Sequence, residues 1–233
     1  MKVLVTGSSK GLGAAISEKL ALEGYEIYGT STSGEGSILG VNTWIKADFS
    51  TDSGIQSFLK ILEELPVFDV LINNAGINII KPQEEVLSNE YEKIQNINLK
   101  APYQIAQHIA KGMTLNGGGK IINIASIWSV ISKTNRTLYS TMKTGIIGMT
   151  RSMAIEWAKQ NILINAVSPG FVMTKLTDES LSLKEKKELK EQVPLGRFAR
   201  PEEIASVVSF LCSEENKYLT GQNIIVDGGF TIS

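Results

Sequence analysis

Seven short apolar runs alternate with longer amphipathic segments along the chain. The runs are KVLVT, YEIYGT, TWIKA, DVLINN, KIINIAS, ILINAVS and NIIVDG. The segments between them have helical periodicity, and the predicted helices end at Leu22, cover residues 55–65, begin near Asn89, and cover residues 138–159 and 201–212. Strands separated by helices pair in parallel through right-handed crossovers. The pattern therefore predicts a doubly wound, seven-stranded parallel sheet with helices on both faces.

Length, charge and cysteine content are typical of one soluble domain that spans residues 1–233. The 233 residues carry a formal net charge of -1 and are 42% hydrophobic. The single Cys212 forms no internal disulfide, and MKVLVTG enters a strand-like run without a signal-peptide core, so a cytoplasmic protein is expected. With no apolar run of about 20 residues and no basic excess, neither a membrane nor a nucleic-acid partner is expected.

One charge-rich segment, residues 178–192, interrupts the alternation of strands and helices. It suits a solvated helix, and it also suits a mobile lid over approximately residues 174–192; the two can hold together. Elsewhere the sequence contains no internal repeat, low-complexity tract or linker-like boundary.

The stretch VTGSSKGLG, residues 5–13, places three glycines between the first predicted strand and the first predicted helix. Gly7 lets the chain turn sharply, and Gly11 and Gly13 let the backbone and the helix approach a pyrophosphate. The unpaired N–H groups and partial positive charge of the helix N-terminus favour the same ligand. A tight turn without a ligand is the alternative, because the spacing G-x-x-x-G-x-G differs from the commonest dinucleotide fingerprint, G-x-G-x-x-G.

Further motifs follow in order along the chain. They are TGSSKGLG (6–13), Asp48, NNAG (73–76), Asn98, Ser126, YSTMK (139–143), PGFVMT (169–174) and TGQNIIVDGG (220–229). Together they resemble the short-chain dehydrogenase/reductase family over nearly the whole chain, and most closely its 3-oxoacyl-acyl-carrier-protein reductases. The resemblance implies a single-domain Rossmann fold and an NAD(P)-dependent oxidoreductase that transfers hydride between a nicotinamide and a carbonyl or alcohol.

Tyr139 and Lys143 are four residues apart in a predicted helix, so their side chains emerge from one face. An ammonium about 4–5 Å from a phenol favours the phenolate by at most ~4 kcal/mol at an effective dielectric of about 20. We therefore expect Lys143 to bring the pKa of Tyr139 towards neutrality, where a general acid/base works best. Taken alone, a chance polar pair is the alternative. The resemblance assigns Tyr139 proton exchange with the substrate oxygen, and Lys143 that pKa shift and a hydrogen bond to the nicotinamide ribose.

Ser126 follows the apolar run KIINIA and so lies at the carboxyl end of a strand, where such sheets bind ligands. The resemblance makes it the substrate-orienting serine, ahead of Ser129 and Ser132. Asn98, in NINLKAP, resembles the fourth catalytic member, whose main chain holds a water that links Lys143 to solvent. Because asparagine is unfavourable inside a helix, a capping or kinking residue is the alternative.

The resemblance also implies the cofactor contacts. NNAG closes the fourth strand, with Asn74 structural and Ala75 and Gly76 against the cofactor. Asp48 reads the adenine amino group, or only caps the helix that follows. Thr174 bonds the carboxamide or the phosphates. The full expected set is Gly7, Ser9, Lys10, Gly11, Leu12, Gly13, Thr32, Asp48, Phe49, Asn74, Ala75, Gly76, Tyr139, Lys143, Pro169, Gly170, Val172 and Thr174.

The second strand ends in GTSTSGEG, without the carboxylate that would chelate the ribose hydroxyls of NAD and repel a 2′-phosphate. Lys10, in the glycine loop, offers a positive charge to that phosphate, as basic residues there do in NADP-using relatives. NADP(H) is therefore favoured. NAD(H) is the alternative, since Lys10 can be a solvated lysine and Glu35 can curl back towards the ribose.

His108 is the only histidine, and its helical run YQIAQHIAKGM places it at a helix-packing or subunit surface. With no neighbouring cluster of His, Cys or carboxylates, the sequence predicts neither a metal site nor a Ser-His-Asp triad. Trp128, two residues after Ser126, lies in the loop expected to face the substrate.

The likeness to acyl-carrier enzymes is strongest in GTSTS and VPLGRFARPEEIASVVSFLCS, which build the cofactor site and the scaffold. In the substrate loop, Leu138 stands where those enzymes tend to have Asn. Gly117 and Gln160 stand where arginines often meet the carrier protein. Three lysines can compensate: Lys111, Lys120 and Lys159.

Three functions stay open. The first is NADP(H)-dependent reduction of a 3-oxoacyl thioester, whose substrate can be linked to a carrier protein. The second is the same chemistry on a sugar, polyol or other small ketone, which Trp128, Asn135 and Arg136 suit about as well. The third, a non-catalytic nucleotide-binding regulator, is disfavoured by the intact catalytic set. The resemblance further implies a homotetramer, with a dimer as the fallback.

Overall fold

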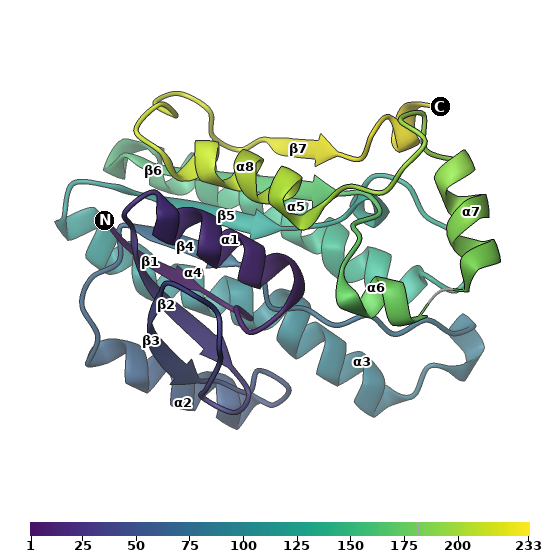
Figure 1. Cartoon of the computed structure of the whole chain (residues 1–233). Coiled ribbons are helices and arrows are strands. Elements are labelled where there is room, and N and C mark those ends of the chain that lie inside the picture. Colours follow the sequence, from purple (N-terminus) through teal and green to yellow (C-terminus); the bar gives the residue numbers. More distant parts are fainter. Residues whose placement is uncertain (181) are drawn as a thin grey trace.

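The computed structural model describes residues 1–180 and 182–233, and its centre is one seven-stranded parallel sheet (Figure 1). The strands lie in the order β3-β2-β1-β4-β5-β6-β7. Their bounds are β1 Lys2–Val5, β2 Glu26–Ser31, β3 Val41–Lys46, β4 Val70–Asn73, β5 Gly119–Ile124, β6 Ile162–Pro169 and β7 Asn223–Val226. All seven predicted strands are therefore present, and the predicted fold class is confirmed.

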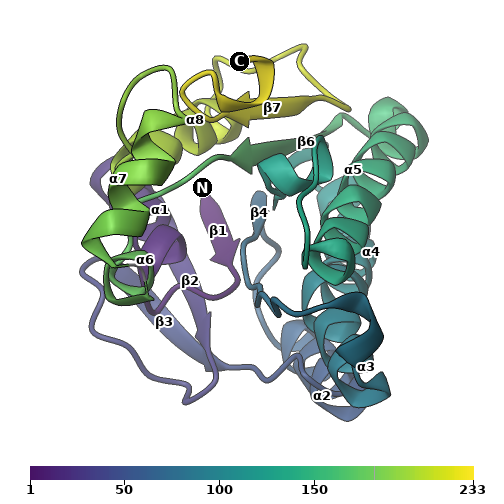
Figure 2. The same cartoon turned by 90° about the vertical axis from the view of Figure 1, so that its right-hand side faces the viewer.

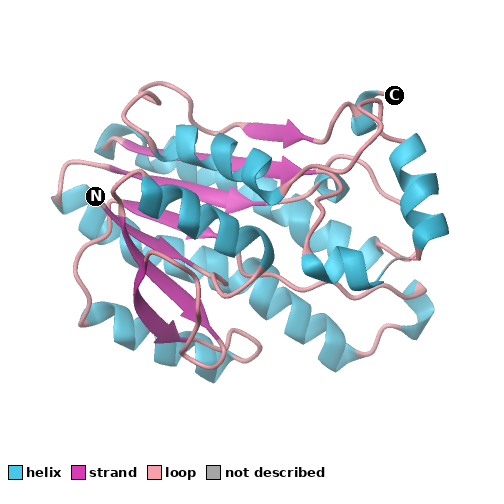
Figure 3. Cartoon of the chain, in the orientation of Figure 1, coloured by secondary structure: helices cyan, strands magenta, loops and turns pink. Residues whose placement is uncertain are grey.

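Helices cover both faces of this sheet. The helices are α1 Gly11–Leu22, α2 Asp52–Glu63, α3 Ser88–Gln95, α4 Ala101–Leu115, α5 Thr137–Trp157, α6 Lys175–Ser180, α7 Leu183–Glu191 and α8 Pro201–Cys212. Figure 2 shows α1 and α8 on one side of the strands and α2, α4 and α5 on the other, and Figure 3 shows the same layers by element type. The chain is a single-domain α/β fold.

Alternation along the central strands explains why two layers of helices are needed. In β1, Val3 and Val5 pack into the core beneath α1 and α8, whereas Leu4 packs into the opposite core with α2, α4 and α5. All three side chains are fully buried. Because successive strand residues point to opposite faces, an all-apolar strand requires cover on both sides, as parallel sheets have.

The strand order creates a crevice where the crossovers change direction. β1 pairs with β2 on one side and with β4 on the other, so the loops that follow these strands diverge to opposite faces. Ligands of open α/β sheets bind at such a switch point, outside the carboxyl ends of the strands. In Figure 1, α6, α7 and the C-terminus lie at the end toward which the strand arrows point. Within the described residues, no helix is long and apolar enough to cross a membrane.

Two segments refine the predicted elements. The helix expected from about Asn89 is two helices, α3 and α4, joined by a π-helical turn at Asn96–Lys100. The charge-rich segment forms α6 and α7, and α7 begins with a capping box in which Ser182 accepts a hydrogen bond from the Glu185 backbone. Part of the predicted lid over residues 174–192, residue 181, lies outside the described residues, and the lid itself stays a prediction.

Candidate active site

The glycine loop between β1 and α1 is packed so closely that two of its glycines, Gly7 and Gly13, have no room for side chains. Gly7 has a φ of +69°, and a Cβ there would lie 3.0 Å from the Cα of Ala75. A Cβ on Gly13 would lie 2.2 Å from the carbonyl oxygen of Gly7. The loop therefore holds its backbone, rather than side chains, against the turn after β4 and against the N-terminus of α1, which favours an anion.

Thr6 ties the glycine loop to the NNAG turn. Its hydroxyl accepts hydrogen bonds from the backbone N–H groups of Asn74 and Ala75, both at 3.0 Å. The Asn74 amide donates in return to the carbonyls of Thr6 and Gly7, at 2.9 and 3.0 Å. Asn74 thus holds the glycine loop and the NNAG turn together. Sequence reasoning assigned no role to Thr6, or to Thr30, whose hydroxyl accepts from the Gly7 N–H at 3.0 Å.

Three of the residues predicted to be catalytic meet where β5 ends beside α5. Ser126 follows β5, and its hydroxyl lies close enough to that of Tyr139 to lower the pKa of the phenol. One turn further along α5, the Lys143 ammonium lies 5.7 Å from the centre of the Tyr139 ring and donates to the Ile124 carbonyl at 2.7 Å. Ser126 and Lys143 are 7% and 4% exposed, so these polar groups face one another in a largely dry site.

The expected electrostatic effect of Lys143 on Tyr139 is not what the structure gives. Burial raises the pKa of Tyr139 to about 12, and the Ser126 hydrogen bond and the positive charge of Arg136 lower it only in part. Burial also lowers the pKa of Lys143 to about 8. The prediction that Lys143 brings Tyr139 towards neutrality is therefore wrong for this structure. The ammonium lies over the ring and bonds to Ile124, while desolvation of the phenolate outweighs the attraction of nearby cations.

Asn98 lies in the π-helical turn between α3 and α4 and is 1% exposed. Its amide accepts from the Ile77 N–H at 2.9 Å and donates to the Ile77 carbonyl at 2.8 Å. A Cβ on Gly76 would lie 3.6 Å from both the Asn98 side-chain oxygen and the Lys143 nitrogen. Asn98 thus fixes the chain after NNAG next to Lys143. Such π turns are frequent at functional sites, and this one accounts for the unfavourable asparagine in a helix.

The residues after β3 correct two details. Asp48 is exposed and accepts from the Ser50 N–H at 2.9 Å, and these hydrogen bonds hold the pKa of its carboxyl below the ordinary value. Thr51 caps α2 by accepting from the Gly54 N–H at 3.1 Å. The alternative that Asp48 caps this helix is therefore wrong. The Phe49 side chain packs edge-on against Phe58 in the core, so only its backbone can face a ligand.

The end of β2 offers hydroxyls where many dinucleotide sites have a carboxylate. Ser31 donates to the Glu35 carbonyl at 2.8 Å, which folds the loop back on itself and leaves the Glu35 side chain exposed. Thr32 and Lys10 are also exposed. Because this hydrogen bond tethers the backbone, the turn is compact. The Lys10 ammonium and the Glu35 carboxylate both remain exposed near it.

The segment after β6 closes the site from the other side. A Cβ on Gly170 would lie 2.8 Å from the Cα of Asp227, so this glycine permits close packing on the chain after β7. A Cβ on Gly11 would lie 3.7 Å from the Thr174 methyl group, which places Thr174 across from the start of α1. Its hydroxyl is 3.0 Å from that of Thr177. Of the other predicted contacts of this segment, Pro169 is the last residue of β6, and Val172 forms an isolated β-bridge with Ala199.

An aromatic wall lines the substrate side and was missed as a unit. Trp128, only 8% exposed, has its ring centre 6.4 Å from those of Phe171 and Phe230. Phe171 lies 5.0 Å from Phe230 and 5.6 Å from Phe198. Arg136 lies over the outer face of Trp128, with its Cζ 5.4 Å from the ring centre. These rings come from four segments that are distant in sequence, so no local pattern could have joined them.

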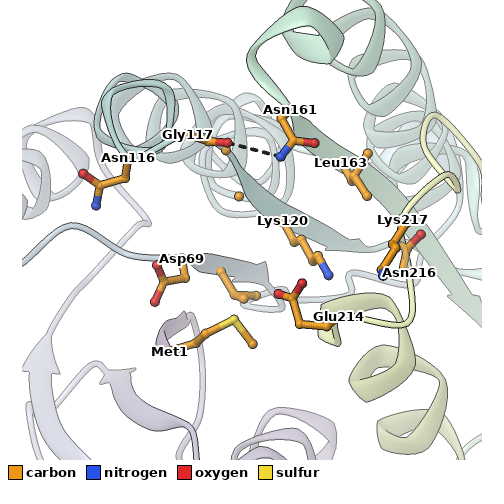
Figure 4. A pocket seen from close by; sticks show the side chains of 13 residues that line it. Met1, Asp69, Asn116, Gly117, Lys120, Asn161, Leu163, Glu214, Asn216 and Lys217 are labelled. Carbon is orange, nitrogen blue, oxygen red and sulfur yellow. Dashed lines mark hydrogen bonds between the residues drawn. The ribbon is translucent and has the colours of Figure 1, made fainter.

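Two cavities of the molecule lie away from this chemistry. One of about 440 Å³ opens at the amino-terminal edge of the sheet, where Gly117 accepts from Asn161 at 3.2 Å beside Lys120 and Glu214 (Figure 4). Another, of about 1030 Å³, lies between α5 and β7. Neither contains Ser126, Tyr139 or Lys143. We place the site at the carboxyl edge because the reactive side chains converge there.

His108 and the carboxylates take no part in this cluster. His108 lies half-buried on α4, and burial, with Lys111 nearby, lowers its pKa. In the described part of the chain, no group of three or more His, Cys, Asp or Glu side chains is arranged to hold a metal ion. The side chains that converge at this edge are instead a hydroxyl, a phenol and an ammonium.

The chain is similar to known proteins over nearly its whole length, including the predicted catalytic residues described above. A family model described as Enoyl-(Acyl carrier protein) reductase matches residues 7–231. The chain is 40% identical over 237 residues to the 3-oxoacyl-[acyl-carrier-protein] reductase FabG of Aquifex aeolicus, covering 97% of this chain and 95% of the relative. It is 31% identical to the NAD-dependent glycerol dehydrogenase of Listeria innocua, covering 98% and 93%. A solved structure from Beutenbergia cavernae, of a protein proposed to be an NAD(P)-dependent gluconate 5-dehydrogenase and holding NADP, matches with a TM-score of 0.89 and 31% identity, covering 100% and 97%.

Proposed function

Because this chain belongs to the short-chain dehydrogenase/reductase family, and is thus an NAD(P)-binding oxidoreductase, we propose that it reduces the carbonyl of a 3-oxoacyl thioester with NADPH. The observation that carries the proposal is the convergence of the Ser126 and Tyr139 hydroxyls beside buried Lys143. A carbonyl oxygen placed between the two hydroxyls would accept a hydrogen bond from each. Reduction requires such donors, because negative charge develops on that oxygen.

The cradle for the dinucleotide is the glycine loop. Its backbone approaches the N-terminus of α1 and the NNAG turn at distances that a Cβ would block, as a pyrophosphate site requires. Gly7, Gly11 and Gly13 with Thr174 would hold the phosphates, Asp48 the adenine, and Lys143 the nicotinamide ribose. When bound, the dinucleotide supplies the hydride.

Tyr139 is the proposed proton donor. With a pKa raised to about 12, the phenol keeps its proton at neutral pH and can release it to the oxygen that gains negative charge. Ser126 orients the same oxygen. Lys143, whose pKa is lowered to about 8, can return a proton, and Asn98 holds the backbone beside it. Proton return then depends on a chain that reaches solvent past Asn98.

NADP(H) is the proposed cofactor. Its support is the exposed Lys10 in the glycine loop, together with the hydroxyl-rich end of β2 and the backbone hydrogen bond that keeps Glu35 in a compact turn. The Beutenbergia structure holds NADP, whereas the Listeria enzyme is named NAD-dependent, so relatives of both kinds exist. Initial rates with NADPH and NADH at equal concentration decide between them.

A second substrate class has support of its own. The Trp128 wall and Arg136 make a polar, partly aromatic site, and relatives named for glycerol and gluconate act on small hydroxylated compounds. The lysines that could meet an acidic carrier protein are also fewer than expected: Lys120 is partly buried and donates to the Ser213 carbonyl, which leaves Lys111 and Lys159 exposed. A small ketone is therefore the alternative to the thioester.

A homotetramer in the cytoplasm completes the proposal. Exposed apolar side chains on α4, α5, α8 and β7 support subunit contacts: Tyr103, Ile155, Phe210 and Ile225. Ile155 and Ile225 both line the cavity between α5 and β7. Sedimentation at micromolar concentration should give a tetramer, and a monomer would contradict the assignment.

One assay tests the function. The protein is mixed with NADPH and, in separate reactions, a 3-oxoacyl thioester, the same acyl group on a carrier protein, and a keto sugar. Oxidation of NADPH with the thioester supports the first substrate class, and faster turnover of the keto sugar supports the second. No NADPH or NADH oxidation with any member would overturn the proposed activity.

A further inference from the structure

We propose that Arg136, held over Trp128 beside Tyr139, is a specificity-determining residue that binds a carboxylate of the substrate, so that the enzyme prefers carbonyl compounds that carry such an anion. The inference deepens the proposed function and rests on it, because it concerns the same site. A 3-oxoacyl thioester has no free carboxylate, so the inference favours the second substrate class, a small ketone that carries one. It names the substrate class that the site selects.

Arg136 lies over an aromatic ring and has no anionic partner among the described residues. Its Cζ lies 5.4 Å from the centre of the Trp128 ring, and Trp128 is itself held by Phe171 and Phe230. In the described part of the chain, the guanidinium has no hydrogen bond or ion pair with a side chain. Stacking on a ring leaves the edges of a guanidinium free, and those edges match a carboxylate with two parallel hydrogen bonds.

The positive charge of Arg136 acts on the Tyr139 phenol, the proposed proton donor. Burial lowers the pKa of the guanidinium, and the Tyr139 phenol is the group whose charge opposes this shift. Arg136 in turn lowers the pKa of Tyr139. The cation therefore lies within electrostatic reach of the proposed proton donor, in a partly dry site where a charged partner is worth more than in water.

No acidic residue lies near Arg136 in the sequence. From residue 93 to residue 155 the chain has no Asp or Glu and eight Lys or Arg. Arg136 also directly precedes α5, whose first turn has no acidic residue, so the positive end of the helix dipole adds to the charge. A purely structural arginine would not be expected here, because a cation at a helix N-terminus is unfavourable. An anionic substrate would offset both the positive charge of Arg136 and that of the helix N-terminus.

The test compares matched acids and esters. Wild type, Arg136→Gln and Lys133→Gln are assayed with NADPH on 2-, 3-, 4- and 5-oxo carboxylates and on the methyl ester of each. Lys133 is the control because it is an exposed cation of the same loop. Wild type should prefer the acid of at least one chain length over its ester. Arg136→Gln should lower kcat/KM for that acid by about 10- to 100-fold, mainly through KM, and leave its ester within about 3-fold.

The outcomes separate the two proposals. Equal losses for acid and ester in Arg136→Gln would show a structural role, and the same loss in Lys133→Gln would show a diffuse charge effect; either overturns the inference. If no member is turned over, saturated carboxylates are titrated calorimetrically into the NADP⁺-bound protein. Binding weakened about 10-fold or more in Arg136→Gln supports the inference even where the proposed activity fails, and equal binding in both proteins overturns it.

Discussion

The cofactor side and the substrate side of the site are built from different materials. The glycine loop and the NNAG turn meet backbone to backbone, tied by Thr6 and Asn74, with no room for a Cβ on Gly13. The substrate side is a wall of side chains, in which Trp128 and Phe230 come from segments about a hundred residues apart. A site formed by close backbone packing suits one ligand that stays the same, the dinucleotide. The side chains of the substrate site, by contrast, can be exchanged without disturbing the fold. The two sides should therefore respond differently to substitution.

The largest effect is expected where the two sides meet. Tyr139→Phe removes the proposed proton donor and keeps the ring, so kcat should fall by about 100- to 10,000-fold for every substrate, with NADPH binding preserved. The measurement is steady-state kinetics with a fluorescence titration of NADPH. Tyr218→Phe, at a position that is 97% exposed, is the matched control and should match wild type. Full turnover by Tyr139→Phe would contradict the assignment of Tyr139 as the proton donor.

Gly13→Ala tests the backbone side alone. The new Cβ would lie 2.2 Å from the Gly7 oxygen and 2.4 Å from the Asn74 amide nitrogen, so the loop must shift. We expect the free energy of unfolding to fall by about 1–3 kcal/mol and NADPH affinity to fall about tenfold or more. Urea unfolding and NADPH titration measure the two effects. Gly148→Ala is the control: it meets open space on α5 and should gain up to about 1 kcal/mol. Wild-type stability in Gly13→Ala would contradict the close packing.

The same contrast explains what could be predicted from the sequence. Strand and helix positions follow from apolar periodicity, and the glycine, serine, tyrosine and lysine positions follow from motifs that are contiguous or lie one turn apart. The aromatic wall could not be predicted, because Phe171, Phe198 and Phe230 meet only after the sheet has folded. Nor could the pKa of Tyr139, since spacing gives the distance to a cation but not the extent of desolvation.

The pH dependence sharpens this point. Lys143, with its pKa lowered to about 8, is an ammonium below that pH and neutral above it, while Tyr139, at about 12, stays protonated. For reduction, kcat/KM should therefore fall above about pH 8, approaching about tenfold per pH unit as the ammonium is lost. Lys143→Arg keeps its charge at these pH values. In this variant the fall of kcat/KM above about pH 8 should therefore disappear, although its overall rate is lower. A limb near pH 7 that persists in Lys143→Arg would instead support the near-neutral pKa of Tyr139 inferred from spacing.

Phe230→Ala tests the side-chain wall without touching the backbone cradle. The ring lost is one of the two that hold Trp128, so KM for the carbonyl substrate should rise about 3- to 10-fold. NADPH affinity should stay unchanged. Ile232→Ala, at an 89% exposed position two residues later, is the control and should leave both values as in wild type. A matching loss of NADPH affinity in Phe230→Ala would mean that the two sides are coupled.

The smallest effect is expected from Lys10, an exposed cation on the otherwise backbone-built side. Lys10→Gln should lower kcat/KM for NADPH by about 5-fold or less and leave that for NADH unchanged, because only the former carries a 2′-phosphate. The loss should shrink as salt is raised from low to about 1 M, where screening acts within a few ångströms. Lys60→Gln, at an exposed position on α2, controls for net charge and should show no such discrimination. Equal losses with both dinucleotides would mean that Lys10 reads the shared pyrophosphate, and that the cofactor side, like its glycines, does not distinguish NADP from NAD.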